Sequence, residues 1–115
     1  MIRGDGTSFY EADSHHNPLR DITIGKMLDE KARELSDQEA LVYSAYKEEG
    51  IDVRWTYSEL KEKVDQVAKG LMGMGVEKGE KVALWATNLP EWILMEFAIS
   101  KIGAVLVTVN INYQP

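Results

Sequence analysis

The stretch Lys81-Val-Ala-Leu-Trp-Ala-Thr-Asn-Leu-Pro-Glu-Trp-Ile-Leu-Met-Glu-Phe-Ala-Ile-Ser-Lys-Ile-Gly-Ala-Val-Leu-Val-Thr-Val-Asn110 decides the fold. It opens with a short apolar run that predicts a buried strand over 82–86. A helix start follows: Asn88 is expected to cap the helix, and Pro90 falls in the first turn, where its missing N–H costs nothing. Glu91 then faces the positive end of the helix dipole.

The second half of this stretch predicts a covered helix and a second strand. Residues 92–102 are almost entirely apolar, and Gly103 supplies a helix stop. Residues 104–109 are apolar and rich in β-branched side chains, a pattern typical of a strand covered on both faces. Strand, covered helix and strand form a βαβ unit, so 82–86 and 104–109 are expected to run parallel with a right-handed crossover. The predicted fold class is therefore α/β.

Composition narrows the function classes. The chain has 115 residues, enough for one domain or less, and its formal net charge of −6 argues against nucleic acid as the main partner. It has no cysteine, which excludes disulfides and thiolate metal sites and fits a reducing compartment. No basic-then-apolar leader opens the chain, and no apolar run approaches the roughly 18 residues of a membrane span. We therefore expect a cytoplasmic protein with no transmembrane segment.

The N-terminal third predicts a leader and an amphipathic helix. Residues 1–21 are polar, mixed in charge and aperiodic, so we expect a loosely ordered leader. Thr23 is expected to cap a helix whose apolar positions follow the 4,4,3 spacing of one helix face. These positions are Ile24, Leu28, Ala32 and Leu35.

A hairpin and a second helix come next. Residues 39–46 and 51–57 flank a polar loop with a glycine, which predicts a β-hairpin. Thr56 and Glu59 match the capping box, and Trp55 and Leu60 occupy the two positions of a hydrophobic staple. The predicted apolar face is Leu60, Val64, Val67, Ala68, Leu71 and Met72. The predicted outward face is Lys61, Glu62, Lys63, Asp65 and Lys69.

The glycine-rich run Gly73-Met-Gly-Val-Glu-Lys-Gly79 invites a phosphate-binding interpretation, but its spacing is G-x-G-x-x-x-G rather than G-x-G-x-x-G. It also follows a helix and precedes a strand, whereas a phosphate loop must place N–H groups at the start of a helix. The run therefore predicts a helix end and a turn.

Two motifs in the leader carry little weight. His15 and His16 lie beside Asp13, but a metal site needs further ligands on a rigid frame, and adjacent side chains diverge in extended backbone. We expect them in a solvated loop. The tripeptide from Arg3 to Asp5 matches a cell-adhesion motif, which we attribute to chance in a cysteine-free chain.

The tryptophans and methionines are more typical of packing than of a ligand site. Trp55, Trp85 and Trp92 could line a pocket, but at strand and helix-start positions core or staple packing is favoured. Met72 and Met74 are expected to fill gaps near a helix end.

No catalytic constellation emerges from the residues. The acid pairs Asp29-Glu30 and Glu48-Glu49 lie on exposed elements with nothing apolar around them to raise a pKa, so paired-carboxylate catalysis is unsupported. No Ser/His/acid arrangement can be proposed either. The sequence therefore predicts no catalytic, cofactor-binding or metal-binding residue in this chain.

Seven short segments, in this order, carry a family resemblance. From about residue 23 to 113 the chain resembles the N-terminal portion of AMP-forming acyl-CoA synthetases, in the adenylate-forming enzyme superfamily. Each segment alone is weak, but their joint order over some ninety residues is specific. The segments are Thr23-Ile-Gly-Lys-Met-Leu28, Gln38-Glu-Ala-Leu-Val42, Trp55-Thr-Tyr-Ser-Glu-Leu60, Gly75-Val-Glu-Lys-Gly-Glu-Lys-Val-Ala83, Asn88-Leu-Pro-Glu-Trp92, Phe97-Ala-Ile-Ser-Lys-Ile-Gly-Ala-Val105 and Val109-Asn-Ile-Asn-Tyr113.

The resemblance implies a two-step reaction in a longer parent enzyme. A carboxylate attacks the α-phosphate of magnesium-bound ATP, giving acyl-adenylate and pyrophosphate, and the thiol of coenzyme A then attacks the acyl carbon. It also implies a Ser/Thr/Gly-rich loop with a lysine, a ribose-binding aspartate and a lysine in a mobile C-terminal domain. No position in residues 1–115 matches these features, so ATP, Mg²⁺ and coenzyme A are expected for the parent and none for this chain.

Within the superfamily, residues 97–110 look closer to medium- and long-chain fatty acyl-CoA ligases than to the adenylation domains of peptide synthetases. Gln114 departs from the family, in which a basic residue often follows the tyrosine. Residues 22–115 are therefore predicted to be an incomplete N-terminal subdomain, inactive alone, whose partners are the rest of the enzyme and, for the parent, a small carboxylic acid.

Two hypotheses about the function of this chain predict different physical behaviour. A framework piece of a ligase leaves a strand edge and apolar surface uncovered, so we expect it to form a dimer or larger species, for which domain swapping is one route. The alternative is a stand-alone small α/β protein-interaction module without enzymatic activity, which would need a closed core of its own.

Overall fold

The computed structural model describes residues 5–6 and 20–113. Most of the predicted leader, with His15 and His16 and the start of the tripeptide at Arg3, lies outside the described residues, as does Gln114. The elements in chain order are helix α1 (Ile24–Glu34), strand β1 (Glu39–Tyr46), the short 3₁₀ helix η1 (Lys47–Glu49), strand β2 (Ile51–Thr56), helix α2 (Tyr57–Gly73), strand β3 (Lys81–Leu84), helix α3 (Pro90–Ile102) and strand β4 (Val105–Thr108).

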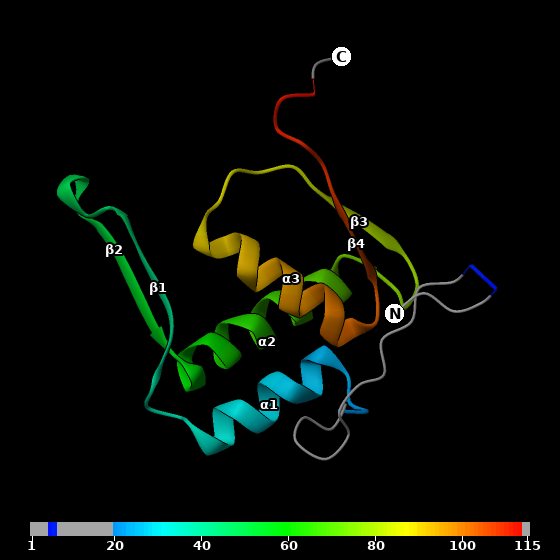
Figure 1. Cartoon of the computed structure of the whole chain (residues 1–115), viewed down its shortest axis with the longest axis horizontal. Helices are drawn as coiled ribbons and strands as arrows, with labels where there is room; N and C mark the ends of the chain where they lie inside the picture. The colour runs from blue at the N-terminus through cyan, green and yellow to red at the C-terminus, as the bar shows by residue number, and fades with distance from the viewer. Residues whose placement is uncertain (1–4, 7–19, 114–115) are drawn as a thin grey trace.

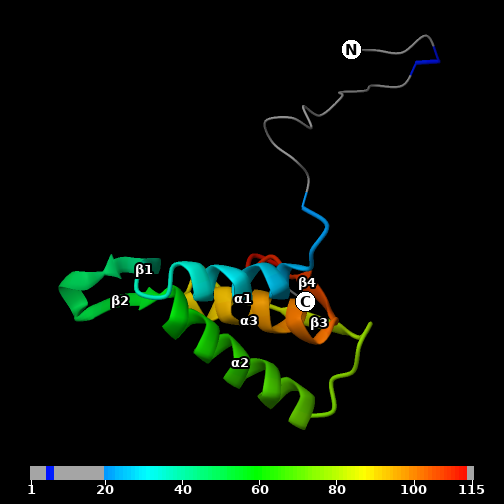
Figure 2. The same cartoon turned by 90° about the horizontal axis from the view of Figure 1, so that it is seen from below.

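Three helices form the body of the described chain, with one two-stranded sheet at each end. Helix α3 contacts both α1 and α2, the β1–β2 hairpin extends from one end of the group, and β3 and β4 lie at the other (Figures 1 and 2). The core lies where the three helices meet. Its buried side chains are Leu28, Leu60, Val64, Ala68, Leu71, Leu94, Ala98 and Ile99.

Side-chain caps fix the starts of α1 and α2, as the sequence predicts. The Oγ1 atom of Thr23 accepts a hydrogen bond of 3.2 Å from the N–H of Lys26. In α2, Thr56 Oγ1 accepts the N–H of Glu59 at 3.2 Å, and the Glu59 carboxylate accepts the N–H of Thr56 at 2.8 Å. This is the predicted capping box, in which each residue satisfies an orphan donor of the other.

The predicted apolar faces of α1 and α2 are confirmed in the middle of each helix and wrong near the start of α1 and the end of α2. Leu28 and Ala32 are buried, but Ile24 in the first turn of α1 is 52% exposed and is not among the described side chains that pack against the core. Met72 and Met74 are 61% and 83% exposed, so they do not fill gaps. They follow Leu71, the last buried residue of α2, where the helix has left the core.

The hairpin and the glycine-rich turn are confirmed. Strands β1 and β2 pair antiparallel, with Tyr43 opposite Val53, and Gly50 leaves η1 in the left-handed conformation at φ +84°. The run after α2 also turns through a left-handed glycine, Gly75, at φ +92°. Gly73 is the last residue of α2, so this run ends a helix and does not begin one.

The βαβ unit is confirmed, although its strands are shorter than predicted. Strands β3 and β4 pair in parallel with Val82 opposite Leu106, and α3 connects them. Gly103 ends α3 at φ +73° and donates its N–H to the last turn. The predicted boundaries 82–86 and 104–109 become Lys81–Leu84 and Val105–Thr108.

Two predictions within this unit are wrong. The N-cap of α3 is Leu89, without a side-chain hydrogen bond, rather than Asn88. The residue before a proline is driven into extended backbone, so Leu89, next to Pro90, must be the last non-helical residue. The sheet is also not covered on both faces by described residues, since Val105 and Val107 are 46% and 38% exposed. Helices lie against one face only.

Candidate functional site

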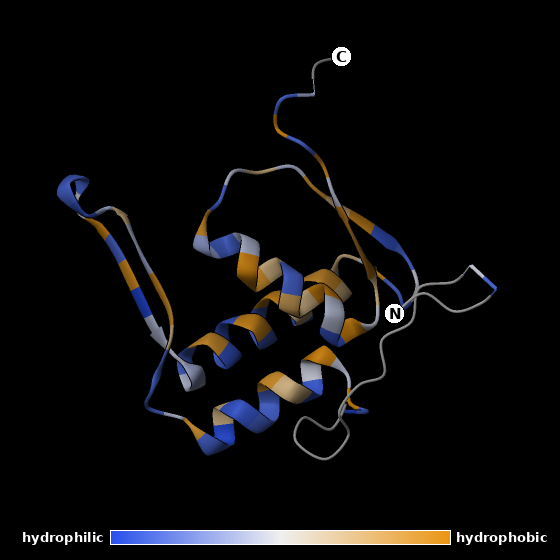
Figure 3. Cartoon of the chain, viewed as in Figure 1, coloured by the Kyte–Doolittle hydropathy of each residue, from blue (hydrophilic) through white to orange (hydrophobic). Residues whose placement is uncertain are grey.

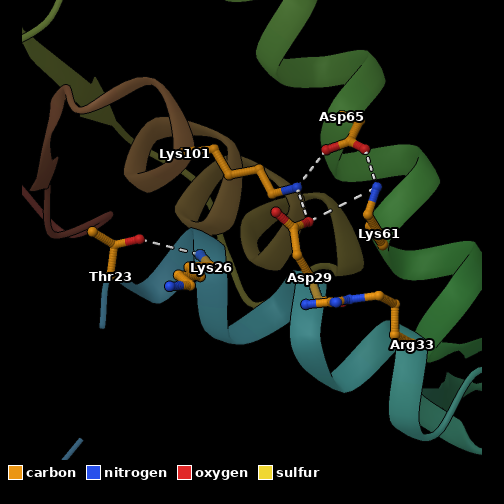
Figure 4. A network of polar contacts seen from close by, with 7 residues as sticks. All are labelled: Thr23, Lys26, Asp29, Arg33, Lys61, Asp65 and Lys101. Atoms are coloured by element: carbon orange, nitrogen blue, oxygen red, sulfur yellow. Dashed lines mark hydrogen bonds and ion pairs between the residues drawn. The ribbon is translucent and has the colours of Figure 1, made fainter. Parts of the chain in front are cut away.

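The strongest polar arrangement among the described residues joins the three helices. The Nζ atom of Lys101, on α3, lies 2.5 Å from a carboxylate oxygen of Asp29, on α1, and 2.5 Å from one of Asp65, on α2 (Figure 4). Lys61 lies 2.6 Å from the other Asp65 oxygen and 3.8 Å from Asp29. We call Asp29, Lys61, Asp65 and Lys101 the helix-joining cluster.

The pKa shifts in this cluster follow from its geometry. Burial by itself raises the pKa of Asp65, but hydrogen bonds from Lys101 and Lys61 outweigh it and hold that pKa below its usual value. Burial by itself lowers the pKa of Lys101, and the hydrogen bonds to Asp29 and Asp65 raise it overall. Asp65 and Lys101 are therefore both charged at neutral pH, and Asp65 is not held as a proton donor. The cluster stabilises the packing of helices and does not resemble a catalytic acid pair.

Sequence reasoning missed this cluster. It placed Lys61 and Asp65 on the outward face of their helix, whereas they lie against α1 and α3. One signal could have pointed to it: Lys101 is the only Lys or Arg in the apolar stretch 92–102. A lysine on a covered helix needs carboxylate partners from the elements that cover it.

A hollow at the carboxyl ends of β3 and β4 is the candidate binding site. In open α/β sheets, ligands bind beyond the carboxyl ends of parallel strands, where the connecting loops leave a crevice. Here that place is a hollow of about 380 Å³. It is lined by Ala86, Thr87, Asn88, Trp92, Val109, Asn110 and Ile111.

The local backbone explains how the hollow forms. Val109 continues the ladder beyond β4 by donating its N–H to the carbonyl of Leu84 at 3.0 Å. Asn110 then turns the chain, because its side-chain oxygen accepts the N–H of Asn112 at 2.9 Å and its carbonyl accepts the N–H of Tyr113 at 3.1 Å. On the opposite wall, Trp92 in the first turn of α3 donates its backbone N–H to Leu89.

The chemistry of this hollow is binding rather than catalysis. Its wall offers two amides, a hydroxyl and an indole, and no side chain in it titrates near neutral pH. It can hold a ligand by hydrogen bonds and stacking, but its lining supplies no cation and no general base that could activate the Thr87 hydroxyl. The catalytic-residue prediction, none, is not tested by this geometry and stays a prediction.

A second hollow, of about 260 Å³, lies between the hairpin and the start of α3. Its wall is mainly apolar and includes Leu41, Val42, Pro90 and Ile93. Tyr43 stands at its edge, where burial, with Tyr46 and Glu91 nearby, raises the pKa of its hydroxyl. The phenol is therefore neutral at physiological pH.

The three tryptophans have three different environments. Trp55 packs against the core, as predicted, and Lys63 Nζ lies 5.1 Å from the centre of its ring. Trp92 lines the hollow at the strand ends, which is the pocket role that the sequence disfavoured. Trp85 is 62% exposed, so the prediction of core packing is wrong for it. It follows Leu84, the last residue of β3, and is not among the side chains that pack against the core.

Within residues 5–6 and 20–113, no group of three or more His, Cys, Asp or Glu side chains is arranged to hold a metal ion. In the same part of the chain, none of the helices combines the length and the apolar character needed to cross a membrane.

Comparison with curated proteins gives relatives that are much longer. YngI of Bacillus subtilis (strain 168), assigned by name to the acyl-CoA synthetases, is 48% identical over 92 residues, which cover 80% of this chain and 16% of YngI. The medium-chain acyl-CoA ligase ACSF2, mitochondrial, of Homo sapiens is 38% identical over 96 residues, covering 84% of this chain and 15% of the relative. The chain thus spans about a sixth of the length of these relatives.

Solved structures share the fold. The Mycobacterium tuberculosis fatty acyl CoA synthetase superposes with a TM-score of 0.72 at 31% identity, covering 79% of this chain and 17% of that one. The N-terminal subdomain of Klebsiella oxytoca NpsA superposes with a TM-score of 0.70 at 30% identity, covering 80% of this chain and 22% of that one. The family described as AMP-binding enzyme matches residues 28–115, which include all three helices' core residues and the whole βαβ unit. The chain is therefore a member of the AMP-binding enzyme family and corresponds to its N-terminal portion.

Proposed function

We propose that this chain is the N-terminal framework of an ATP-dependent, AMP-forming acyl-CoA synthetase. The reaction of the whole enzyme joins a carboxylic acid to coenzyme A at the expense of ATP. Acyl-adenylate and pyrophosphate form first, and transfer of the acyl group to the thiol then releases AMP. ATP, Mg²⁺ and coenzyme A are the cofactors proposed for that whole enzyme, and a small carboxylic acid is its proposed substrate.

The observation that carries this proposal is the family match over residues 28–115 together with relatives that are acyl-CoA synthetases or ligases by name. Medium- or long-chain fatty acids are the proposed substrate class. Support comes from the ACSF2 relatives, which are named medium-chain ligases, and from the fatty acyl CoA synthetase among the solved structures.

The proposed role of these residues is structural rather than catalytic. The first half-reaction needs cations and aligned N–H groups around the phosphates as charge develops there. The hollow at the strand ends carries no cation, and the lysines of the helix-joining cluster are engaged by carboxylates. We therefore propose that residues 20–113 hold neighbouring parts of the enzyme in place and that the 115-residue chain alone is inactive.

A chimera tests the framework role. Residues 28–113 replace the aligned segment of human ACSF2, and acyl-CoA formation from medium-chain acids is measured with ATP and coenzyme A. A functional framework should keep activity within about tenfold of the host, because it supplies packing and no reacting group. The same chimera with Val64→Asp, which buries a charge in the helical core, should lose activity and fold poorly.

The complementary measurement is ATP–pyrophosphate exchange by the 115-residue chain alone. We expect none. Exchange above background, or a chimera that melts cooperatively yet makes no acyl-CoA, would contradict the division between framework and chemistry.

The proposed compartment is the cytoplasm. The cysteine-free composition fits a reducing environment. The ACSF2 relatives are mitochondrial by name, so cell fractionation that recovers the protein with mitochondria would contradict this proposal.

The stand-alone interaction module would need a closed core. Among the described residues, Val105 and Val107 of the β3–β4 sheet stay exposed, which favours the framework instead.

A further inference from the structure

A third hollow lies between the helices and the open end of the hairpin. It has a volume of about 460 Å³, and α1, β1, α2 and α3 all contribute residues to its wall. It adjoins the smaller hollow beside the start of α3, with which it shares Leu41 and Ile93. Figure 3 shows hydrophobic residues on each of the four elements. This hollow is therefore at the hairpin end of the helices, whereas the β3–β4 sheet is at the other end (Figures 1 and 2).

The wall of this hollow is mainly apolar and is held in place by the helical core. Leu28 and Leu60 in the wall are buried. Ile93 and Phe97, also in the wall, pack against the core. Met27 is 36% exposed and adds an unbranched thioether side chain, which adapts to ligands of irregular shape. Small-molecule sites are concave, largely pre-formed and about 300–1,000 Å³ in volume, and this hollow falls within that range.

Lys31 is the one charged side chain among the described residues of this wall. Its Nζ atom lies 2.6 Å from the carboxylate of Glu34, and the two side chains are 37% and 55% exposed. An exposed pair of this kind is weak, and the ammonium group has three N–H donors, of which Glu34 takes one. Lys31 can therefore bind the anionic group of a ligand whose apolar part lies in the hollow.

We propose that this hollow binds an aliphatic carboxylate, with the hydrocarbon tail against the wall and the carboxylate on Lys31. A cationic amphiphile would meet the ammonium group, and a small hydrophilic anion would leave the apolar wall exposed to water. The choice of a fatty acid among aliphatic carboxylates rests on the proposed function, since such acids are its proposed substrates. The wall contains no group proposed to react, so this is a binding site and not a second reaction centre.

Calorimetric titration of the 115-residue chain with hexanoate, octanoate, decanoate and dodecanoate tests the fit of the tail. Each added CH₂ group that the wall covers should tighten binding by up to about fourfold. The gain should cease once the tail is longer than the hollow, and one molecule should bind per chain. We expect a dissociation constant for decanoate on the order of 100 μM. Affinity that rises at every step, or several molecules per chain, would indicate unspecific adsorption and overturn the proposal.

Substitutions of Lys31 test the head group. Lys31→Met should weaken decanoate binding by about threefold to tenfold, and Glu34→Gln should tighten it by removing the competing carboxylate. Lys31→Glu should reverse the preference, so that decylamine binds more tightly than decanoate. Lys69→Glu, at an exposed position of α2 outside the wall, is the matched control and should still prefer decanoate. An unchanged preference in Lys31→Glu would overturn the assignment of the carboxylate to this lysine.

Filling the hollow tests its position. Ala40 is a partly buried residue of the wall, and Ala40→Phe should weaken decanoate binding by more than about tenfold. Ala45→Phe, at an exposed position of the same strand, is the matched control and should still bind. Trp85→Glu removes exposed apolar surface at the other end of the molecule and should also still bind. Binding that survives Ala40→Phe, or that is lost in Trp85→Glu, would overturn the proposal. If circular dichroism shows that Ala40→Phe is unfolded, the reversal of preference by Lys31→Glu decides.

The outcome for this site can be separated from the outcome for the proposed function. None of these titrations uses ATP or coenzyme A, whereas the chimera is measured by acyl-CoA formation. A chain that binds no fatty acid, beside a chimera that makes acyl-CoA, would refute the site and leave the framework role standing. Specific binding of decanoate beside an inactive, folded chimera would support the site and contradict the framework role.

Discussion

Replacing Lys101 by methionine should destabilise the fold more than the matched change Lys61→Met. Methionine keeps an unbranched apolar stem, which can still pack against Gly25, and removes only the ammonium group. The Lys101 side chain is 14% exposed and bonds two carboxylates at 2.5 Å, whereas Lys61 is 36% exposed. Without Lys101, the carboxylates of Asp29 and Asp65 face each other with Lys61 as their one remaining cation among the described residues, while α3 still packs through its apolar side chains.

The expected loss of unfolding free energy on Lys101→Met lies between the values for a buried and an exposed ion pair. Removing one partner of a buried ion pair costs about 3–5 kcal/mol, and removing one partner of an exposed pair costs about 0–1 kcal/mol. The Asp29 and Asp65 side chains are 41% and 30% exposed, so water reaches both carboxylates once the lysine is gone. We therefore expect about 1.5–3 kcal/mol for Lys101→Met and less than about 1 kcal/mol for Lys61→Met.

Urea unfolding followed by helical circular dichroism measures both changes under one set of conditions. At about 4–8 °C per kcal/mol for a domain of this size, Lys101→Met should also lower the melting temperature by roughly 6–24 °C. Both variants should be compared at a single low protein concentration, so that self-association is the same in each. Equal destabilisation by the two substitutions, or none by Lys101→Met, would refute the assigned role of Lys101.

The free energy of unfolding should depend on pH through the ion pair of Asp65 and Lys101. The pKa of Asp65 is lowered on folding, so its stabilisation is fully present above the unfolded pKa of about 3.9 and is lost as the pH falls through the folded pKa. The pKa of Lys101 is raised, so its stabilisation is present below about 10.4 and is lost as the pH rises through the folded pKa. The difference in unfolding free energy between the original chain and Lys101→Met should therefore be flat between about pH 5 and 9 and shrink beyond both ends.

Five further substitutions, at four positions, test packing and capping by the same urea assay. Gly25→Ala should destabilise the fold by about 1–3 kcal/mol, since a Cβ atom there would lie 2.7 Å from Lys101 Cγ and 3.2 Å from its Cα. Gly70→Ala should instead stabilise the fold by about 0.5–1 kcal/mol, because a Cβ atom there has nothing within 4 Å. Equal signs for the two glycines would contradict the close approach of α1 to α3. Thr56→Ala should cost about 0.5–2 kcal/mol by removing the capping box of α2, and Thr56→Ser should restore most of it. Ile99→Ala should cost about 2–5 kcal/mol because this side chain is fully buried, and a cost below about 1 kcal/mol would show that the core has been misplaced.

Local signals explain what could be predicted from the sequence. The capping box at Thr56, the left-handed turn at Gly50 and the helix stop at Gly103 each depend on a few neighbouring residues. The parallel pairing of β3 and β4 is a long-range feature. It could be predicted because an apolar helix between two apolar runs allows few other arrangements.

Features that join distant segments could not be predicted. Lys101 bonds Asp29 and Asp65 across 72 and 36 positions of sequence, and a charged residue on a helix is ordinarily interpreted as solvent-exposed. The hollow at the strand ends is a similar case, because Trp92 and Asn110 lie near each other only after α3 has crossed the sheet. The family resemblance implied a function for the parent enzyme, but it assigned no residue of this chain to a catalytic or binding site.

Helix α3 explains why the two sides of the molecule differ. It is covered by α1 and α2 on one side and by β4 on another, so its polar groups must be satisfied internally. Ser100 donates its hydroxyl to the carbonyl of Glu96 at 2.8 Å, Lys101 bonds two carboxylates, and no buried side-chain polar atom of the described residues lacks a partner. The polar groups of α3 are therefore satisfied within the described chain, whereas exposed apolar side chains remain at both ends of the molecule. They include Trp85, Val105 and Val107 at the β3–β4 sheet and Ile24 and Met72 on the helices, so further burial can stabilise the fold at either place.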